Sequence, residues 1–307
     1  MALVTQQTRS GLVFGVLAYL GWGLFPLYWP LLEPASPFEV LAHRVVWSLV
    51  FCTGLLTFTR RWRSFAALVR DRGQLGWLAL ASIVIAVNWG SFIWGVNNGH
   101  VLEVSLGYFI NPLITVLFAV FFLKESLRRQ QWVAVGVGAV AVGILTVDLG
   151  RPPWIALLVS ASFAVYGLIK KRTSLGAVEA LTVETTVLFP FALCFLVALQ
   201  LRGDLAFGHE GAGNTTLLVL TGVVTAVPLL LFAAAASRLN LSTIGLLQYL
   251  VPIMHFILGL TVFGEQMGSA RWIGFVLIWI ALAIFTLDAW RSHRRSLHRA
   301  ARGATVL

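Results

Sequence analysis

The sequence predicts an all-α membrane protein whose ten transmembrane helices form two inverted five-helix repeats. First, the 307 residues are 59% hydrophobic and only 11% charged, which leaves too few polar side chains to cover a water-soluble globule. Second, the chain repeats itself at a spacing of 140 positions without a gap, so that Pro112 corresponds to Pro252 and Glu125 to Glu265. A duplication of this length predicts that the two halves share one fold.

Apolar segments long enough to cross a bilayer follow one another along the whole chain. A helix needs roughly 20 apolar residues to span about 30 Å of hydrocarbon. The first segment carries Pro26 and Pro30 and is too long for a signal peptide, so we expect it to remain as a helix. The predicted helices are residues 11–32, 37–58, 75–96, 101–123, 131–148, 153–170, 177–200, 214–237, 243–264 and 271–290.

The repeat divides the chain into a first unit at residues 1–148, a second at 149–290 and a basic tail at 291–307. Three of the 22 Lys and Arg residues fall in predicted outer segments, Arg44 lies within a helix, and the other eighteen share the side of the N-terminus. The positive-inside rule therefore predicts that both termini face the cytoplasm. Because each unit has five helices, the second unit is expected to cross the membrane in the opposite sense.

Each unit carries a proline in the middle of its fourth helix. A proline within a helix removes one hydrogen bond, so Pro112 and Pro252 are expected to free the carbonyl groups of Tyr108 and Gln248. Inside a membrane, such groups are tolerated only where protein or trapped water satisfies them. Matched interruptions in two halves indicate the substrate site of a transporter. We therefore expect these helix breaks to border a substrate cavity.

Aromatic and amide residues near the two prolines and on the neighbouring helices are the candidate substrate-binding set. Aromatic walls with a few amides suit a small, partly apolar or aromatic solute. The candidates are Trp22, Asn88, Trp89, Tyr108, Asn111, Tyr166, Gln248 and Tyr249. The alternative is that they fill packing gaps. Tryptophans near predicted helix ends are instead interpreted as an interfacial belt, namely Trp29, Trp62, Trp77, Trp154 and Trp290.

Two charged residues fall deep inside predicted helices, where each charge costs about 2.5 to 3.5 kcal/mol without a partner or a wet cavity. Arg44 and Glu184 occupy equivalent positions of the two repeats. Their predicted depths differ by about 7 Å, which an arginine side chain can span. We predict that helices 37–58 and 177–200 meet and that these two residues form an ion pair. A gate or coupling site and a static strut are the alternative roles.

Histidines and carboxylates supply the remaining candidates. Because histidine as a residue type titrates near physiological pH, His43 and His255 are candidate proton relays, although each could instead bond to a neighbour, so proton coupling stays open. Ser36 and Glu39 match a capping box. Carboxylates at helix C-termini are disfavoured by the helix dipole, and we expect cations close by in sequence to compensate them: Arg128 or Arg129 for Glu125, Arg151 for Asp148, Arg271 for Glu265 and Arg291 for Asp288.

A glutamate that ends the fourth helix and a tryptophan that opens the fifth resemble the EamA unit of the drug/metabolite transporter superfamily. Residues 21–29, 43–48, 88–100, 166–171 and 184–190 are similar to the RarD branch of that superfamily, often labelled chloramphenicol-sensitive protein. The resemblance covers nearly the whole chain. It implies a bacterial inner-membrane permease for a small metabolite or drug that works without ATP, and it supplies no binding residues.

The sequence therefore predicts a secondary active transporter that moves a small organic solute by alternating access. A nucleotide-sugar or amino-acid exchanger of the same superfamily is the first alternative. An integral-membrane lipid-modifying enzyme and a channel or receptor are further ones. The chain has no HExxH or phosphate-binding glycine motif and no clustered metal ligands, so we expect no enzyme, cofactor or metal. Its +10 charge lies in short clusters between apolar runs, so no nucleic acid is expected, and a monomer and a homodimer both stay open.

Overall fold

The computed structural model describes residues 2–124, 126–170, 176–239 and 241–304, so the expected compensation of Glu125 lies outside the described residues. Every regular element in this part of the chain is a helix, which confirms the all-α class. The elements are α1 (Ala2–Gly23), α2 (Phe25–Tyr28), η1 (Trp29–Leu32), α3 (Pro37–Phe58), α4 (Trp62–Arg70), α5 (Arg72–Asn97), α6 (Val101–Leu123), α7 (Arg129–Leu149), α8 (Trp154–Lys170), α9 (Ala177–Arg202), α10 (Gly211–Ala236), α11 (Leu241–Leu247), α12 (Leu250–Thr261) and α13 (Ser269–Ala304).

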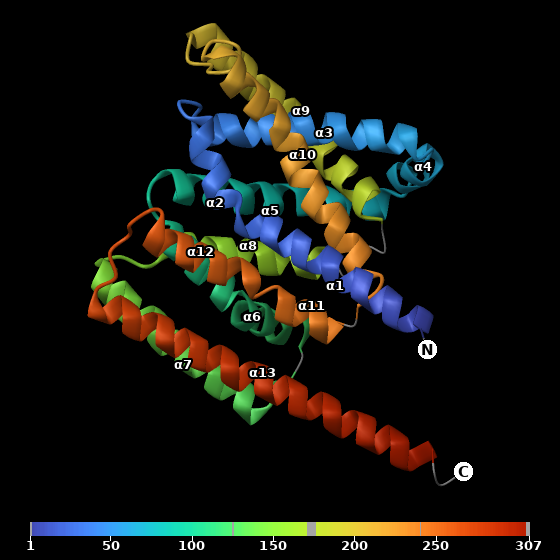
Figure 1. Cartoon of the computed structure of the whole chain (residues 1–307), viewed down its shortest axis with the longest axis vertical. Coiled ribbons are helices and arrows are strands. Elements are labelled where there is room, and N and C mark those ends of the chain that lie inside the picture. The colour runs from blue at the N-terminus through green and yellow to red at the C-terminus, as the bar shows by residue number, and fades with distance from the viewer. Residues whose placement is uncertain (1, 125, 171–175, 240, 305–307) are drawn as a thin grey trace.

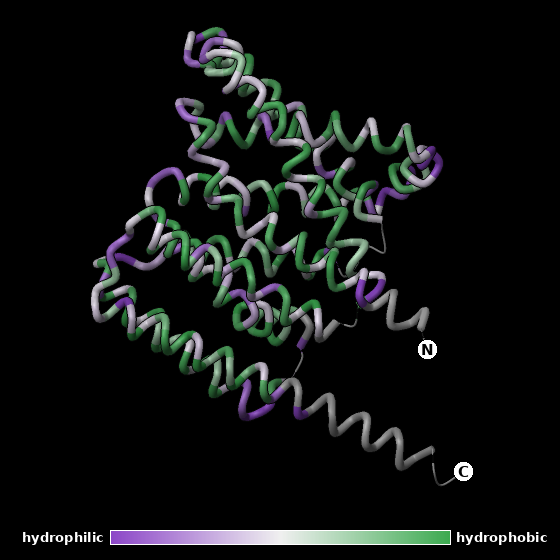
Figure 2. Tube along the Cα trace, viewed as in Figure 1, coloured by the Kyte–Doolittle hydropathy of each residue, from purple (hydrophilic) through white to green (hydrophobic). Residues whose placement is uncertain are grey.

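These helices have the lengths and compositions of a polytopic membrane protein. Eight stretches of the described chain are long and apolar enough to cross a bilayer, and a ninth arises when α1 and the α2–η1 segment, bent by 43°, count as one span. The remaining predicted segment, residues 153–170, corresponds to α8, which is apolar but only 17 residues long. Apolar residues form the bodies of the helices and polar residues gather toward their ends (Figure 2). That all ten segments cross the membrane stays a prediction.

Helix contacts join the two halves in reciprocal sets. Helices α5 and α6 of the first half both pack on α8 of the second half. Their equivalents in the second half, α10 and α12, pack in the same way on α1 of the first half. The contact of α3 with α10 has its equivalent in the contact of α5 with α9. Two further contacts join equivalent helices, α3 with α9 and α6 with α12. The remaining equivalent pair, α7 and α13, lies side by side along the lower edge of the bundle (Figure 1). The halves therefore interlock, and most of the interior is shared between them.

The closest approaches between helices occur at glycines. A Cβ atom on Gly222 of α10 would overlap the carbonyl group of Trp47 in α3 and would lie 2.9 Å from the amide nitrogen of Ser48. A Cβ atom on Gly107 of α6 would lie 2.9 Å from the carbonyl oxygen of Ala156 in α8. Small residues permit such backbone contact between membrane helices, so these positions set the spacing of α3 from α10 and of α6 from α8.

One helix and one extension differ from the prediction. The nine-residue helix α4 was not predicted because it is far too short to span a bilayer. Its Leu68 is buried against α5 and α9 in a small cluster with Leu78 and Val183. Helix α13 continues through most of the predicted tail to Ala304. Both chain ends and α4 lie at the right of the view in Figure 1, at the same end of the bundle.

The proline-containing helices differ between the halves. Helix α11 ends at Leu247 and α12 begins at Leu250, so the chain turns at Gln248 and Tyr249, just before Pro252. Helix α6 instead runs through Pro112 without interruption. A single proline removes only one hydrogen bond, and α8 and α12 pack along α6, which keeps its two parts together. The expected matched pair of breaks is therefore not observed.

Ion pairs at the helix ends also differ from the prediction, because their partners come from the opposite half. Asp148 at the end of α7 accepts from Arg271 of α13 at 2.9 Å. Arg128 Nη2, just before α7, lies 2.7 Å from Asp288 Oδ2 of α13. Since α7 and α13 are antiparallel neighbours, the C-terminus of each adjoins the N-terminus of the other. The expected partners Arg151 and Arg291 are therefore not the ones used.

Candidate functional site

Arg44 lies in the interior of α3 and is only 3% exposed. Its Nε atom donates a hydrogen bond to Thr225 Oγ1 of α10 at 2.8 Å. Its guanidinium carbon lies 3.9 Å from the ring centroid of Trp89 in α5, which is a close cation–π contact. One arginine thus joins two helices of the first half to one helix of the second.

Aromatic rings of the first half surround this arginine, and His255 of the second half packs against two further rings of the group. The Arg44 guanidinium lies 5.3 Å from the ring centroid of Trp29 and 5.5 Å from that of Phe25. Phe92 contacts Trp29 on one side and stacks on His255 of α12 at 5.3 Å on the other. Tyr108 of α6 completes the group through ring contacts with Phe92 and His255. We call this set the central cluster: Phe25, Trp29, Arg44, Trp89, Phe92, Tyr108, Thr225 and His255.

His255 connects the central cluster to α1. Its Nε2 atom lies 3.2 Å from the carbonyl oxygen of Trp22, and the residue is 1% exposed. The Trp22 ring packs against Tyr19 and against Phe232 of α10. Trp22 therefore contributes its backbone to the central cluster, whereas its side chain fills the contact between α1 and α10.

Three polar atoms of the central cluster are buried without a hydrogen-bond partner. They are Nη1 of Arg44, Nε1 of Trp29 and Nδ1 of His255. A buried polar group left in this state costs about 1 to 3 kcal/mol. Most buried polar groups in native proteins are paired, so each exception calls for an explanation. The central cluster therefore combines apolar walls with unused hydrogen-bonding capacity, as a ligand site does.

The predicted ion pair between Arg44 and Glu184 is wrong. Glu184 of α9 is 2% exposed and accepts hydrogen bonds from Lys170 Nζ at 3.0 Å and from the Tyr166 hydroxyl at 3.2 Å. Both partners belong to α8. Helices α3 and α9 do pack together, but Arg44 faces α5 and α10, and the end of α8 supplies the cation that Glu184 uses.

Two predicted amides serve helix packing or local structure. Asn88 of α5 donates from Nδ2 to the carbonyl oxygen of Val159 at 2.9 Å and to Ser162 Oγ at 3.1 Å. Both acceptors lie in α8, so this side chain fastens α5 to α8. Asn111 accepts only from Thr115, one turn further along α6. The structure therefore brings neither amide into the central cluster.

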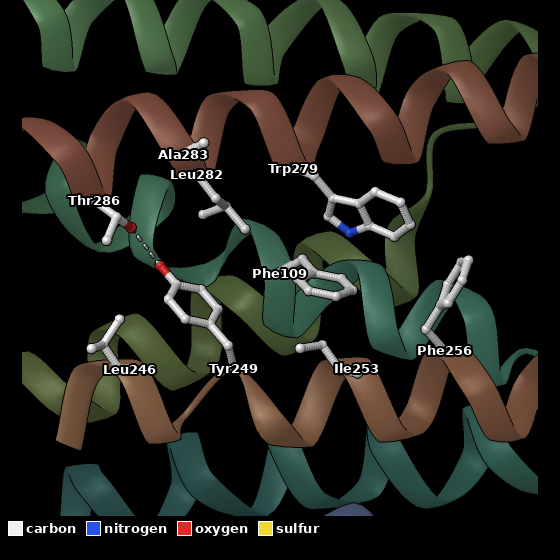
Figure 3. A pocket seen from close by; sticks show the side chains of 9 residues that line it. All are labelled: Phe109, Leu246, Tyr249, Ile253, Phe256, Trp279, Leu282, Ala283 and Thr286. Atoms are coloured by element: carbon white, nitrogen blue, oxygen red, sulfur yellow. Dashed lines mark hydrogen bonds between the residues drawn. The ribbon is translucent and has the colours of Figure 1, made fainter. Parts of the chain in front are cut away.

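A cavity, which we call the lateral cavity, lies between α6, the break of α11 and α12, and α13. It has a volume of about 520 Å³, and nearly all of its walls are apolar (Figure 3). Tyr249, beside the break, turns its hydroxyl toward Thr286 Oγ1 of α13 at 3.4 Å. Gln248 precedes Tyr249 in the same turn and is half-buried. Tyr249 therefore lines this lateral cavity, and neither Tyr249 nor Gln248 belongs to the central cluster.

His43 lies one turn before Trp47 on α3, away from the central cluster. Its Nδ1 atom accepts from Trp47 Nε1 at 3.3 Å, and its Nε2 atom lies 3.8 Å from Glu39. Glu39 itself accepts from the backbone amides of Ala206 and Phe207 in the loop before α10. Ser36 Oγ caps the Glu39 amide, as the predicted capping box requires, and the glutamate side chain also bonds to the other half.

Sequence reasoning missed four members of the central cluster, namely Phe25, Trp29, Phe92 and Thr225. Trp29 was assigned to an interfacial belt, yet it is fully buried beside Arg44, so that assignment is wrong. The 43° bend before α2 turns the segment inward, and its signal was the pair of prolines at positions 26 and 30. Thr225 was not singled out because a threonine in an apolar run has no distinctive pattern. In the described residues no three His, Cys, Asp or Glu side chains are grouped to hold a metal.

Fold and site together define a polytopic helical membrane protein in which two interlocked repeats share a buried polar and aromatic cluster. Comparison with known families adds the particular class. The profile of the EamA-like transporter family matches residues 9–147 and, a second time, residues 152–287. The chain belongs to this family.

Similar proteins are named RarD or uncharacterized transporter. A protein of Streptomyces exfoliatus named Protein RarD is 51% identical, with 96% of this chain and 93% of that protein covered. The uncharacterized transporter YojE of Bacillus subtilis is 44% identical, with 94% and 98% covered. One solved structure, described as "Crystal structure of protein", aligns with a TM-score of 0.55 at 17% identity. The alignment covers 92% of this chain and 98% of that one. That structure supports the fold alone.

Proposed function

We propose that this membrane transporter is a secondary active transporter, which moves a small organic metabolite or drug by alternating access without ATP hydrolysis. The observation that carries the proposal is the central cluster, because both halves build it and its buried polar atoms lack partners. A site shared by two repeats near the middle of the bundle is where transporters of this kind bind their solute.

Burial of the central cluster supports the alternating mechanism. Arg44 and His255 are almost fully shielded from solvent, so a solute reaches them only when helices separate. The interface that must open lies between the halves, where α3 meets α10 and α1 meets α12. Rocking of one half against the other would expose the central cluster to one side at a time.

Glu184 is the candidate coupling or gating residue in this proposal. It is a buried carboxylate next to Lys170 and Tyr166 at the end of α8, and buried ionisable residues in membrane helices mark proton and ion pathways. We place the protein in the bacterial inner membrane with both termini in the cytoplasm, as a monomer or homodimer. Clustered Lys and Arg at the proposed cytoplasmic ends support this orientation.

Flux measurements in reconstituted vesicles test the proposal. The panel holds chloramphenicol, aromatic metabolites, amino acids and a nucleotide sugar, each with and without an imposed proton gradient. We expect saturable, protein-dependent flux of at least one small solute that needs no ATP, and strict dependence on a solute inside the vesicle would assign exchange instead. Flux that never saturates would indicate a channel and would refute alternating access.

A matched pair of tryptophan variants locates the transport site. Trp89→Ala removes the ring that covers Arg44 and is expected to lower transport at least tenfold. Trp62→Ala makes the same chemical change at an exposed position on α4 and is expected to leave transport unchanged. Equal effects of the two substitutions, at equal protein levels in the vesicles, would remove the central cluster from the transport path.

A further inference from the structure

Arg44 is a buried cation whose charge is not balanced by a carboxylate. The guanidinium group stays protonated in proteins, and a charge within a bilayer requires a partner. Five pairs of Arg or Lys with a carboxylate, and one contact of His43 with Glu39, lie within 4 Å in the described part of the chain, and none includes Arg44. Its predicted partner Glu184 is bound to Lys170 instead. The surrounding protein thus leaves one positive charge available in its interior.

The way in which Arg44 is held leaves part of its hydrogen-bonding edge unused. The ring of Trp89 covers the guanidinium at 3.9 Å, and a ring in that position leaves the in-plane N–H groups free. Thr225 accepts from Nε only, while Nη1 has no partner. Arginine recognises carboxylates through these in-plane groups, often with two parallel hydrogen bonds.

A second donor lies in the same cluster. Trp29 Nε1 is buried without an acceptor, and its ring lies 5.3 Å from the Arg44 guanidinium. An indole N–H can only donate. A ligand that satisfies both residues must therefore supply acceptor oxygens. One arginine charge matches a single negative charge, and the rings of Phe25, Trp89 and Phe92 suit an aromatic or apolar body.

We infer that the central cluster binds the carboxylate group of a small aromatic or apolar monoanion, with Arg44 as the binding residue for its charge. This inference rests on the proposed transport function and narrows its substrate class. It replaces the expected static or gating pair with Glu184 by a site whose anion is supplied from outside the chain.

Equilibrium binding to the purified full-length chain in detergent tests the inference without a transport measurement. The probes are benzoate, phenylacetate and indole-3-acetate, each paired with its neutral amide, together with phenyl phosphate. A ligand that binds the folded state raises the melting temperature in proportion to its affinity and concentration. We expect at least one carboxylate to bind ten times or more tightly than its amide. Indifference to charge in all three pairs, or a preference for phenyl phosphate, would overturn the inference.

Substitutions assign the effect to Arg44. Arg44→Gln is expected to weaken carboxylate binding about ten- to hundredfold, the contribution of hydrogen bonds to a charged group, and to leave amide binding unchanged. Arg44→Lys keeps the charge without the planar donors, so its affinity for the carboxylate should lie between those of the wild type and Arg44→Gln. Arg63→Gln removes the same charge from an exposed position on α4 and should change nothing. If Arg44→Gln keeps wild-type carboxylate binding, the inference is refuted. If the Arg44→Gln variant does not fold, the comparison of each carboxylate with its amide on the wild-type protein still tests the inference.

The two proposals fail in different ways. If the carboxylate binds in an Arg44-dependent manner but reconstituted vesicles show no flux of any solute, the transport function falls and the anion site stands. If vesicles show saturable flux of neutral solutes, equal in wild type and in Arg44→Gln, and no carboxylate is preferred to its amide, the anion site falls and the transport function stands.

Discussion

Replacing Gly222 by alanine tests the close packing of α10 on α3, which holds Thr225 near Arg44. A Cβ atom at this position would overlap the backbone carbonyl of Trp47 and would also approach the Ser48 amide at 2.9 Å. Because both obstacles are backbone atoms, no side-chain rotation relieves the overlap, and the helices must separate. We therefore expect Gly222→Ala to destabilise the folded protein.

The magnitude follows from two opposing effects. Overpacking of a close contact costs about 1 to 3 kcal/mol, while alanine is better than glycine within a helix by about 1 kcal/mol. Gly54→Ala in α3 is the matched control, because a Cβ atom there meets no atom within 4 Å and only the favourable effect applies. The free energies of unfolding of the two variants should therefore differ by about 1 to 3 kcal/mol.

Thermal unfolding in detergent measures this difference. For a chain of 307 residues, the melting temperature changes by roughly 2 °C for each kcal/mol, so Gly222→Ala should melt about 2 to 6 °C below Gly54→Ala. We also expect its transport to fall, because separation of α3 from α10 moves Thr225 away from Arg44. Equal melting temperatures for the two variants would refute the close approach of these helices.

Three further predictions concern charges outside the central cluster. Burial raises the pKa of Glu265 to about 7 from its ordinary 4.5, so the folded protein holds a proton that the unfolded chain has lost. Stability relative to Glu265→Gln should therefore fall as pH rises between about 5 and 7.5 and level off above it, and pH-independent differences in melting temperature would contradict this. Lys170→Met leaves the buried carboxylate of Glu184 without its cation and should lower the free energy of unfolding by roughly 1 to 3 kcal/mol. Adding Glu184→Met should recover most of this loss. Additive losses in the double-mutant cycle would contradict the pairing. Asp148→Arg and Arg271→Asp should each cost about 1 kcal/mol, and the double reversal should restore the melting temperature.

Much of the fold could be predicted because bilayer thickness ties helix length to sequence composition. Each of the ten predicted segments coincides with a helix or a bent pair of helices. The rule fails for α4, which is amphipathic and nine residues long, since no length criterion applies to a helix outside the hydrocarbon. The relation between bilayer thickness and helix length also does not show where a proline breaks a helix. Helix α6 continues through Pro112, while the chain turns before Pro252. This difference depends on the neighbouring helices.

The site could be predicted in residue type but not in its contacts. Arg44, Trp89, Tyr108 and His255 were all candidates, and the structure brings them into one cluster. The predicted partner of Arg44 was wrong because equivalent positions in two repeats fix similar depths in the membrane but not the direction in which each side chain points. Arg44 turns toward α5 and α10, and that rotation of α3 is set by packing throughout the bundle.

The ion pairs at the helix ends show most directly why side-chain partners could not be predicted from the sequence. A carboxylate at the C-terminus of one helix is best compensated by a cation near the N-terminus of an antiparallel neighbour, where the two helix dipoles also attract. The neighbour of α7 is its own equivalent, α13, so Asp148 pairs with Arg271 and Asp288 with Arg128. Glu265 likewise accepts from the first amides of α6, the equivalent of its own helix. For the two aspartates, cations near in sequence were the wrong place to search, because in an antiparallel pair of equivalent helices the compensating charge comes from the other copy.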